Sequence, residues 1–114
     1  MRRLSRSFRC AFKGVGVLLR TQHNARIHLA ATVFAIAAGV FLGISPGEWL
    51  AVVLAIGLVW AAEGLNTAVE LLADRVAPGV HPQVGRAKDA AAAGVLLASA
   101  AALAVGLVVY LPRL

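Results

Sequence analysis

The sequence has few charged residues, few aromatic residues and a single cysteine. Of its 114 residues only 14% are charged and 6% aromatic, whereas 61% are hydrophobic, and the mean hydropathy is +0.84. Ordinary soluble domains carry about 25% charged residues, so this composition excludes one. Cys10 has no second cysteine to pair with, so no internal disulfide can form. We expect one all-α membrane domain over residues 1–114, built largely of lipid-facing helices.

Acidic residues are scarce as well. Five Asp and Glu stand against eleven Lys and Arg, which gives a formal net charge of +6 and a pI near 11.2. Proteins that bind single-stranded nucleic acid stack bases on aromatic side chains in a basic groove, and here the aromatic residues are few and scattered. The basic residues instead gather at the N-terminus and in one loop, which fits an anionic membrane surface. We therefore predict no nucleic-acid partner.

The first 24 residues predict an amphipathic helix that lies on the membrane surface. Apolar residues recur at steps of three or four, as the core-facing stripe of a helix requires. These residues are Leu4, Phe8, Phe12, Val15 and Leu19. Basic residues supply the other side of the helix, as in helices that bind the headgroup region. No cleavable signal is evident, because the first long apolar run begins only after about 26 residues and lacks a small-residue cleavage site.

Three apolar runs predict three transmembrane helices, at about 27–44, 48–75 and 85–111. A turn at 45–47 and a Pro- and Gly-containing loop at 77–82 separate them. We also expect Glu48 to lie in the first turn of the second helix, where a carboxylate suits the helix dipole.

Basic residues set the expected orientation. They are concentrated in the N-terminal helix and around the loop at 75–88, and the turn at 45–48 has none. By the positive-inside rule, the N-terminus and the 75–88 loop are cytoplasmic and the C-terminus lies outside. On the third helix every fourth residue is small, which favours close helix packing. This row consists of Ala90, Gly94, Ala98, Ala102 and Gly106.

A polar stripe continues the second apolar run. At about 100° per residue, Glu63, Asn66, Glu70 and Asp74 fall within roughly 80° of one another, with Thr67 at the edge. Carboxylates on one stripe repel each other unless a cation sits among them, and ionisable groups in a membrane are expensive. The stripe is therefore a candidate site near the cytoplasmic interface. The alternative is a solvated face on a helix end that leaves the membrane.

The third helix supplies the opposite charge. Lys88 offers a compact cation for phosphate, and Asp89 offers a further metal or amine ligand. Together with the acidic stripe they suggest phosphoryl transfer to a lipid hydroxyl, which needs positioning, charge neutralisation by metal and a base. The sequence contains neither a GxxxxGK[ST] loop nor a GxGxxG loop. Composition and spacing alone therefore do not identify ATP as the donor.

These residues resemble a family. The pattern E-x-x-N-[ST]-A-[IV]-E-x-x-x-D-R starts at Glu63, and A-K-D follows at Ala87. The two motifs together are highly specific, and with them nearly the whole chain resembles the prokaryotic diacylglycerol kinase and undecaprenol kinase family. The resemblance implies ATP-dependent phosphorylation of a membrane lipid alcohol by a homotrimer in the bacterial inner membrane. It implies MgATP as donor and active sites between neighbouring chains at the cytoplasmic face.

The resemblance also implies roles for individual residues. Glu63 is expected to act as the general base, or to orient the lipid hydroxyl. Glu70 is expected to bind Mg²⁺, Asn66 to help place the phosphates or the metal, and Lys88 to contact the β- and γ-phosphates. Two further residues are expected to bind near the nucleotide, Asp74 and Asp89.

One region departs from the family pattern. Relatives often carry a glutamate at or near the positions of Gln22 or His28, which is thought to share the metal with the residue at Glu70. Neither position is acidic here. Asn24 or His28 could take over this role, and the sequence leaves the choice open.

Two questions of function stay open at this point. The short N-terminus and the ending Gly106–Leu114 resemble the undecaprenol kinase branch more than the diacylglycerol kinase branch. A non-enzymatic scaffold or a cation-conducting subunit is the competing class. Such a cation path should cross the whole bilayer, yet from Leu50 to Ala62 the indole of Trp60 is the only polar side-chain group. The sequence therefore favours the kinase.

Overall fold

The computed structural model describes residues 2–114, which form a chain of four helices. They are α1 (Arg2–Thr21), α2 (His23–Leu42), α3 (Pro46–Val76) and α4 (Pro82–Tyr110), and a short 3₁₀ turn, η1 (Leu111–Arg113), follows. The all-α prediction is confirmed. Three stretches are long and apolar enough to cross a membrane: α2, α3, and α4 continued through η1. The chain is thus a multi-pass membrane protein.

The corner between α1 and α2 lies at Gln22, earlier than the sequence suggested. Gln22 has an extended backbone, at φ −112° and ψ 116°, and α2 begins at the next residue. The guanidinium of Arg26 reaches back and donates to the carbonyls of Leu19 and Arg20, at 3.0 and 2.9 Å. These carbonyls have no partner in the last turn of α1, so Arg26 satisfies the helix end and fixes the corner.

The turn between α2 and α3 covers residues 43–45, and Pro46 already begins α3. Gly43 closes α2 in the left-handed region, at φ 63°, which only glycine adopts at little cost. Pro46 suits the first helical position because its missing N–H would be unpaired there in any case. Ser45 and Glu48 form a reciprocal capping box, with bonds of 3.2 and 2.9 Å. The expected place of Glu48 is confirmed.

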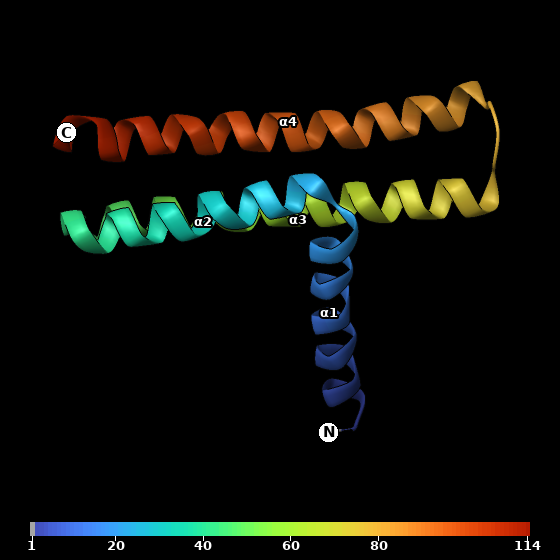
Figure 1. Ribbon diagram of the computed structural model, residues 1–114, viewed down its shortest axis with the longest axis horizontal. Helices are drawn as coiled ribbons and strands as arrows, with labels where there is room; N and C mark the ends of the chain where they lie inside the picture. Colours follow the sequence, from blue (N-terminus) through green and yellow to red (C-terminus); the bar gives the residue numbers. More distant parts are fainter. Residues whose placement is uncertain (1) are drawn as a thin grey trace.

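The helices differ in direction. α2, α3 and α4 run side by side, whereas α1 leaves them crosswise at the corner (Figure 1). α3 and α4 form a long antiparallel hairpin, with the most extensive contact of any helix pair, and continue together past the corner to their connecting loop. The acidic end of α3 and the basic start of α4 therefore lie together, beyond the level at which α1 departs.

Little of the apolar surface is buried within the chain. A small core of Ile44, Val52 and Val109 lies at the end of the bundle far from the α3–α4 loop. Most other large apolar side chains of α2, α3 and α4 point outward, as expected for helices in lipid.

The predicted row of small residues on α4 packs closely only in part. Ala98 is buried, whereas Ala90 and Gly94 are exposed. A step of four residues turns the helix by about 400°, so the row drifts by about 40° at each step. Its first members have therefore rotated away from the face that meets the bundle.

Candidate active site

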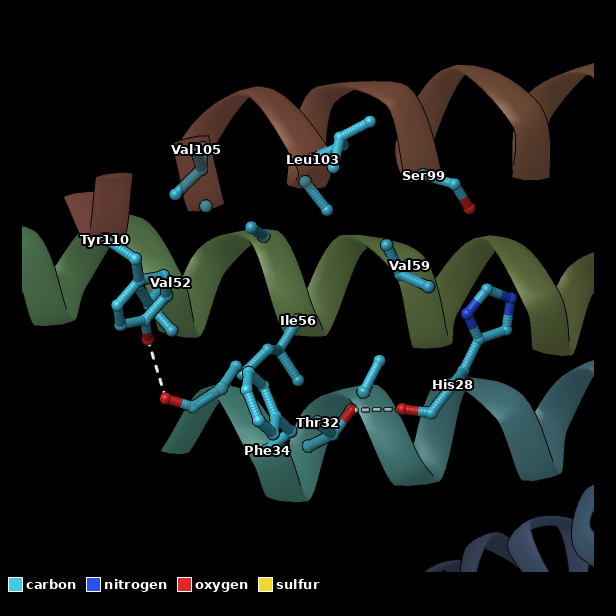
Figure 2. A pocket seen from close by; sticks show the side chains of 15 residues that line it. His28, Thr32, Phe34, Val52, Ile56, Val59, Ser99, Leu103, Val105 and Tyr110 are labelled. Atoms are coloured by element: carbon cyan, nitrogen blue, oxygen red, sulfur yellow. Dashed lines mark hydrogen bonds between the residues drawn. The ribbon is translucent and has the colours of Figure 1, made fainter. Parts of the chain in front are cut away.

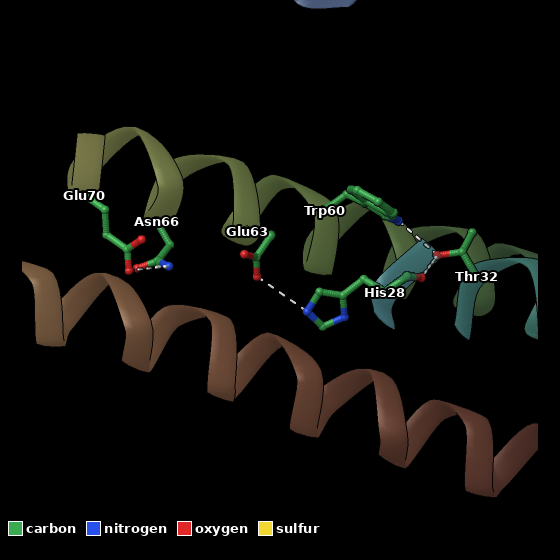
Figure 3. A network of polar contacts seen from close by, with 6 residues as sticks. All are labelled: His28, Thr32, Trp60, Glu63, Asn66 and Glu70. Carbon is green, nitrogen blue, oxygen red and sulfur yellow. Dashed lines mark hydrogen bonds and ion pairs between the residues drawn. The ribbon is translucent and has the colours of Figure 1, made fainter. Parts of the chain in front are cut away.

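The polar stripe of α3 centres on a buried carboxylate. Glu63 is only 1% exposed, and its Oε2 accepts no hydrogen bond from the described residues. The basic side chain in ion-pair range is His28 on α2, whose Nε2 lies 3.5 Å from Oε2 (Figure 3). That distance is within ion-pair range but longer than the 2.7–3.2 Å that is typical of hydrogen bonds. A carboxylate buried with one weak partner is costly, so Glu63 is poised to take on another interaction.

Asn66, Thr67 and Glu70 follow on the next turns of α3. The amide of Asn66 donates to Glu70 Oε1 at 3.4 Å, and both side chains project from the same side of α3 as Glu63 (Figure 3). Asn66 and Thr67 are buried, at 9% and 3% exposure. Asn66 Oδ1 and Thr67 Oγ1 also lack a hydrogen-bond partner among the described residues. Three unpaired oxygen atoms on consecutive turns are rare in a folded protein, where nearly all buried polar groups are paired.

The residues expected near the nucleotide lie further along the hairpin. Lys88 Nζ on α4 contacts Asp74 Oδ1 on α3 at 2.5 Å, and Asp89 is exposed beside Lys88. Eleven residues of helix separate Glu63 from Asp74, roughly 16 Å at about 1.5 Å per residue. The structure therefore divides the predicted site residues into a buried group around Glu63 and an exposed group at the hairpin end.

The described residues do not by themselves gather a set of metal ligands. Over residues 2–114 no three His, Cys, Asp or Glu side chains are close enough together to hold a metal ion. Gln22 lies at the α1–α2 corner and Asn24 is exposed, while His28 contacts Glu63. The structure thus pairs His28 with the expected base rather than with Glu70.

A second polar contact joins α2 to α3, and sequence reasoning missed it. Trp60 Nε1 donates to Thr32 Oγ1 at 2.9 Å, and the same hydroxyl donates to the backbone carbonyl of His28 at 2.7 Å. Both side chains lie deep in apolar runs, where an unpaired donor is unfavourable. The apolar runs that contain Thr32 and Trp60 have few other polar side chains. This scarcity was the signal in the sequence that pointed to a contact between the two residues.

Two cavities adjoin His28. The larger, about 420 Å³, lies between α2, α3 and α4 and extends from His28 to Tyr110 at the far end (Figure 2). Its walls are mostly aliphatic, and the Tyr110 hydroxyl donates to the carbonyl of Ala35 at 2.6 Å. The smaller, about 280 Å³, lies between α2 and α4, with Asn24 and Ser99 as further polar lining. A buried carboxyl group near an apolar cavity suits a substrate that is part hydroxyl and part hydrocarbon.

Comparison with known proteins agrees with this chemistry. Residues 9–110 match the family described as prokaryotic diacylglycerol kinase. The chain is 34% identical to an undecaprenol kinase of Bacillus subtilis (strain 168) over 114 residues, covering 100% of this chain and 93% of that protein. It is 40% identical to a diacylglycerol kinase of Synechocystis sp. over 109 residues, covering 95% of this chain but 62% of that protein.

These similarities favour the enzyme over the scaffold or the cation-conducting subunit. They extend over all three membrane-crossing helices and include the whole polar stripe of α3. The chain therefore belongs to the prokaryotic diacylglycerol kinase family and is a lipid kinase.

Proposed function

We propose that this protein transfers the γ-phosphoryl group of MgATP to undecaprenol at the cytoplasmic surface of the bacterial inner membrane. The observation that carries the proposal is the burial of Glu63 to 1% exposure, with an Oε2 that is unpaired among residues 2–114. A carboxylate in that state can accept the proton of a lipid hydroxyl, the task of a general base in phosphoryl transfer. Its place on a membrane-crossing helix brings it to a lipid rather than to a soluble alcohol.

The residues after Glu63 fit a magnesium ion. Mg²⁺ takes oxygen ligands from one or two carboxylates together with substrate phosphates. Glu70 and Asn66 already contact one another at 3.4 Å, and Asn66 Oδ1 is buried with no hydrogen-bond partner in the part of the chain that the structure describes. We assign Glu70 as the metal ligand and Asn66 as a residue that helps to place the metal or the phosphates. Bound Mg²⁺ would neutralise negative charge on the transferring phosphates.

The hairpin end fits the nucleotide. Lys88 is 37% exposed and Asp74 is 66% exposed, so their contact lies open to water. An exposed ion pair contributes little to stability, about 0–1 kcal/mol, so a triphosphate can draw Lys88 away from Asp74 at small cost. We assign Lys88 to the β- and γ-phosphates, and Asp74 and Asp89 to positions beside the nucleotide.

α1 fits a helix that lies on the cytoplasmic membrane surface. It runs crosswise to the three membrane-crossing helices (Figure 1). Leu4, Phe8 and Phe12 are 57%, 58% and 73% exposed, although they are among its most apolar residues. Lipid would cover these side chains, while the basic residues of α1 would meet anionic headgroups. This placement keeps the N-terminus in the cytoplasm.

We propose a homotrimer as the active form. Within residues 2–114 no three His, Cys, Asp or Glu side chains gather to hold a metal ion, and much of the apolar surface of α2 and α4 is uncovered. A neighbouring chain could complete the site and cover part of that surface. The family resemblance implies this assembly with shared sites.

The acceptor lipid is assigned from the relatives. The Bacillus protein, which is named for undecaprenol, is matched by this chain over 93% of its length, whereas the Synechocystis diacylglycerol kinase is matched over 62%. Undecaprenol is therefore the leading acceptor and diacylglycerol the second candidate. The mostly aliphatic cavity beside His28 is compatible with a hydrocarbon chain.

Transfer of ³²P from MgATP by the purified protein in detergent tests the proposal. Undecaprenol and diacylglycerol are offered in separate reactions at equal mole fraction in the micelle. Label in undecaprenol at ten or more times the rate for diacylglycerol, about 1.4 kcal/mol of discrimination, supports the proposal. Label mainly in diacylglycerol would overturn the choice of acceptor, and label in neither lipid would overturn the proposed reaction.

A further inference from the structure

Glu63 is sealed from solvent, but its partner is not. The exposed fraction of the side chain is 1% for Glu63 and 18% for His28, and 3.5 Å separates Glu63 Oε2 from His28 Nε2. Within residues 2–114, His28 is the only basic side chain in ion-pair range of Glu63. Among the described residues, His28 is therefore the basic group that can accept a proton from Glu63.

A polar contact joins the helix turn that carries His28 to the turn that carries Glu63. Thr32, one turn further along α2, donates to the His28 carbonyl and accepts from Trp60, a residue one turn before Glu63 on α3. Trp60 thus ties the turn of α2 that carries His28 to the turn of α3 that carries Glu63 (Figure 3). The contact joins the two helix turns and so fixes the backbone positions from which His28 and Glu63 project.

A second cavity adjoins His28. This cavity, of about 280 Å³ between α2 and α4, is lined by three polar side chains, His28, Asn24 and Ser99, and by four apolar ones, Ile27, Ala92, Val95 and Leu96. A water molecule occupies about 30 Å³ of liquid volume and needs polar partners, and this cavity offers both. Asn24 is exposed one turn closer to the α1–α2 corner, so the cavity leads from His28 toward the membrane surface.

We propose that His28 is the proton exit of Glu63, a proposal that rests on the proposed role of Glu63 as the base. As the lipid oxygen bonds to the γ-phosphorus, the bond from phosphorus to the ADP oxygen breaks and ADP keeps its electron pair. The lipid hydroxyl loses its proton to Glu63. That proton then passes to His28 Nε2, and a proton leaves from Nδ1 to water in the smaller cavity. Glu63 is a carboxylate again before the next turnover.

Two substitutions at one position separate proton transfer from packing. Gln at position 28 can still donate a hydrogen bond to Glu63 but cannot carry a proton onward. We expect His28→Gln to lower kcat by about 10- to 100-fold, toward the lower end of what positioned acid–base groups contribute, with little change in the KM for lipid. His28→Ala leaves space for a small base, so added imidazole should raise its kcat in proportion to imidazole concentration. His81→Gln, in the exposed loop before α4, is the matched control and should keep wild-type kcat without response to imidazole.

The experiment distinguishes a failure of the role proposed for His28 from a failure of the role proposed for Glu63. If His28→Gln keeps wild-type kcat, or if His28→Ala is impaired but unresponsive to imidazole while its circular dichroism and elution volume match wild type, the proton exit is wrong. In that case a loss of activity in Glu63→Gln would still support the proposed base. If Glu63→Gln turns over normally, the proposed base itself fails, and the proton exit fails with it.

Discussion

Lys88 on α4 and Asp74 on α3 contact one another at 2.5 Å beside the loop that joins the two helices, although they are fourteen positions apart in the sequence. A matching contact, also 2.5 Å, joins Arg113 after α4 to Glu48 at the start of α3. The hairpin is thus fastened at both ends by ion pairs, and only one of the two lies beside the polar stripe. A substitution in the Arg113–Glu48 pair can therefore serve as the control for a substitution in the Lys88–Asp74 pair.

The first prediction concerns Lys88. Lys88→Met should raise the KM for MgATP by about 10- to 100-fold, because a hydrogen bond to a charged group contributes about 1.5–3 kcal/mol. The KM for lipid should stay within about twofold. Arg113→Met breaks the equivalent pair at the far end and should leave the KM for MgATP unchanged. Equal KM values for MgATP in Lys88→Met and wild type would show that Lys88 serves the hairpin alone.

The second prediction concerns the metal. Glu70→Gln keeps the size of the side chain and its contact with Asn66 but removes a charge that Mg²⁺ needs. The Mg²⁺ concentration for half-maximal activity should rise by about tenfold or more, the range seen when a group that supports a metal is removed. Glu48→Gln, at the other end of the bundle, should leave the titration where it is. If the Mg²⁺ dependence of activity is the same in Glu70→Gln and wild type, Glu70 is not a ligand of the metal.

The third prediction concerns the packing of α2 on α3. A Cβ at Gly39 would lie 2.7 Å from Trp49 Cη2 and 2.9 Å from Trp49 Cζ2, closer than real Cβ atoms approach a neighbour, so the indole would have to shift. Gly39→Ala should therefore destabilise the protein by about 1–3 kcal/mol, as measured by unfolding in SDS. Gly57→Ala meets nothing within 4 Å and should be neutral or stabilising. A Gly39→Ala protein as stable as Gly57→Ala would contradict the packing described.

The fourth prediction concerns Thr32 and Trp60. Thr32→Val leaves the Trp60 N–H without an acceptor in an apolar interior, which should cost about 1–2 kcal/mol of unfolding free energy. In a double-mutant cycle with Trp60→Phe, the coupling energy should be about 0.5–1.5 kcal/mol. Thr21→Val removes a hydroxyl that bonds only within its own helix end, to Val17, and should show no coupling to Trp60. Additive effects at Thr32 and Trp60 would argue against the bond.

The helices were predictable because their signals are local. Apolar runs of sufficient length identify membrane-crossing helices, and Phe8 and Phe12 mark a stripe on α1 by spacing alone. The grouping of Glu63, Asn66 and Glu70 also follows from residues on one helix, whose relative directions are fixed at about 100° per residue. Such features need no knowledge of how the helices pack.

Contacts between helices were not predictable in this way. The approach of His28 to Glu63, and of Tyr110 to Ala35, depends on how α2 is rotated against α3 and α4. That rotation is set by the sum of many weak apolar contacts, which a single sequence does not resolve. The α1–α2 corner was misplaced for a related reason, since Arg26 fixes it by reaching back to Leu19 and Arg20.

The most direct test of the account is phosphoryl transfer by Glu63→Gln. Glutamine has nearly the shape of glutamate and can hydrogen-bond to His28, but it cannot accept the proton of a lipid hydroxyl. Purified protein in detergent, matched to wild type in circular dichroism and elution volume, is assayed with MgATP and undecaprenol. The account predicts a kcat at least about 100-fold below wild type, with little change in the KM for MgATP. A kcat within about threefold of wild type would contradict it.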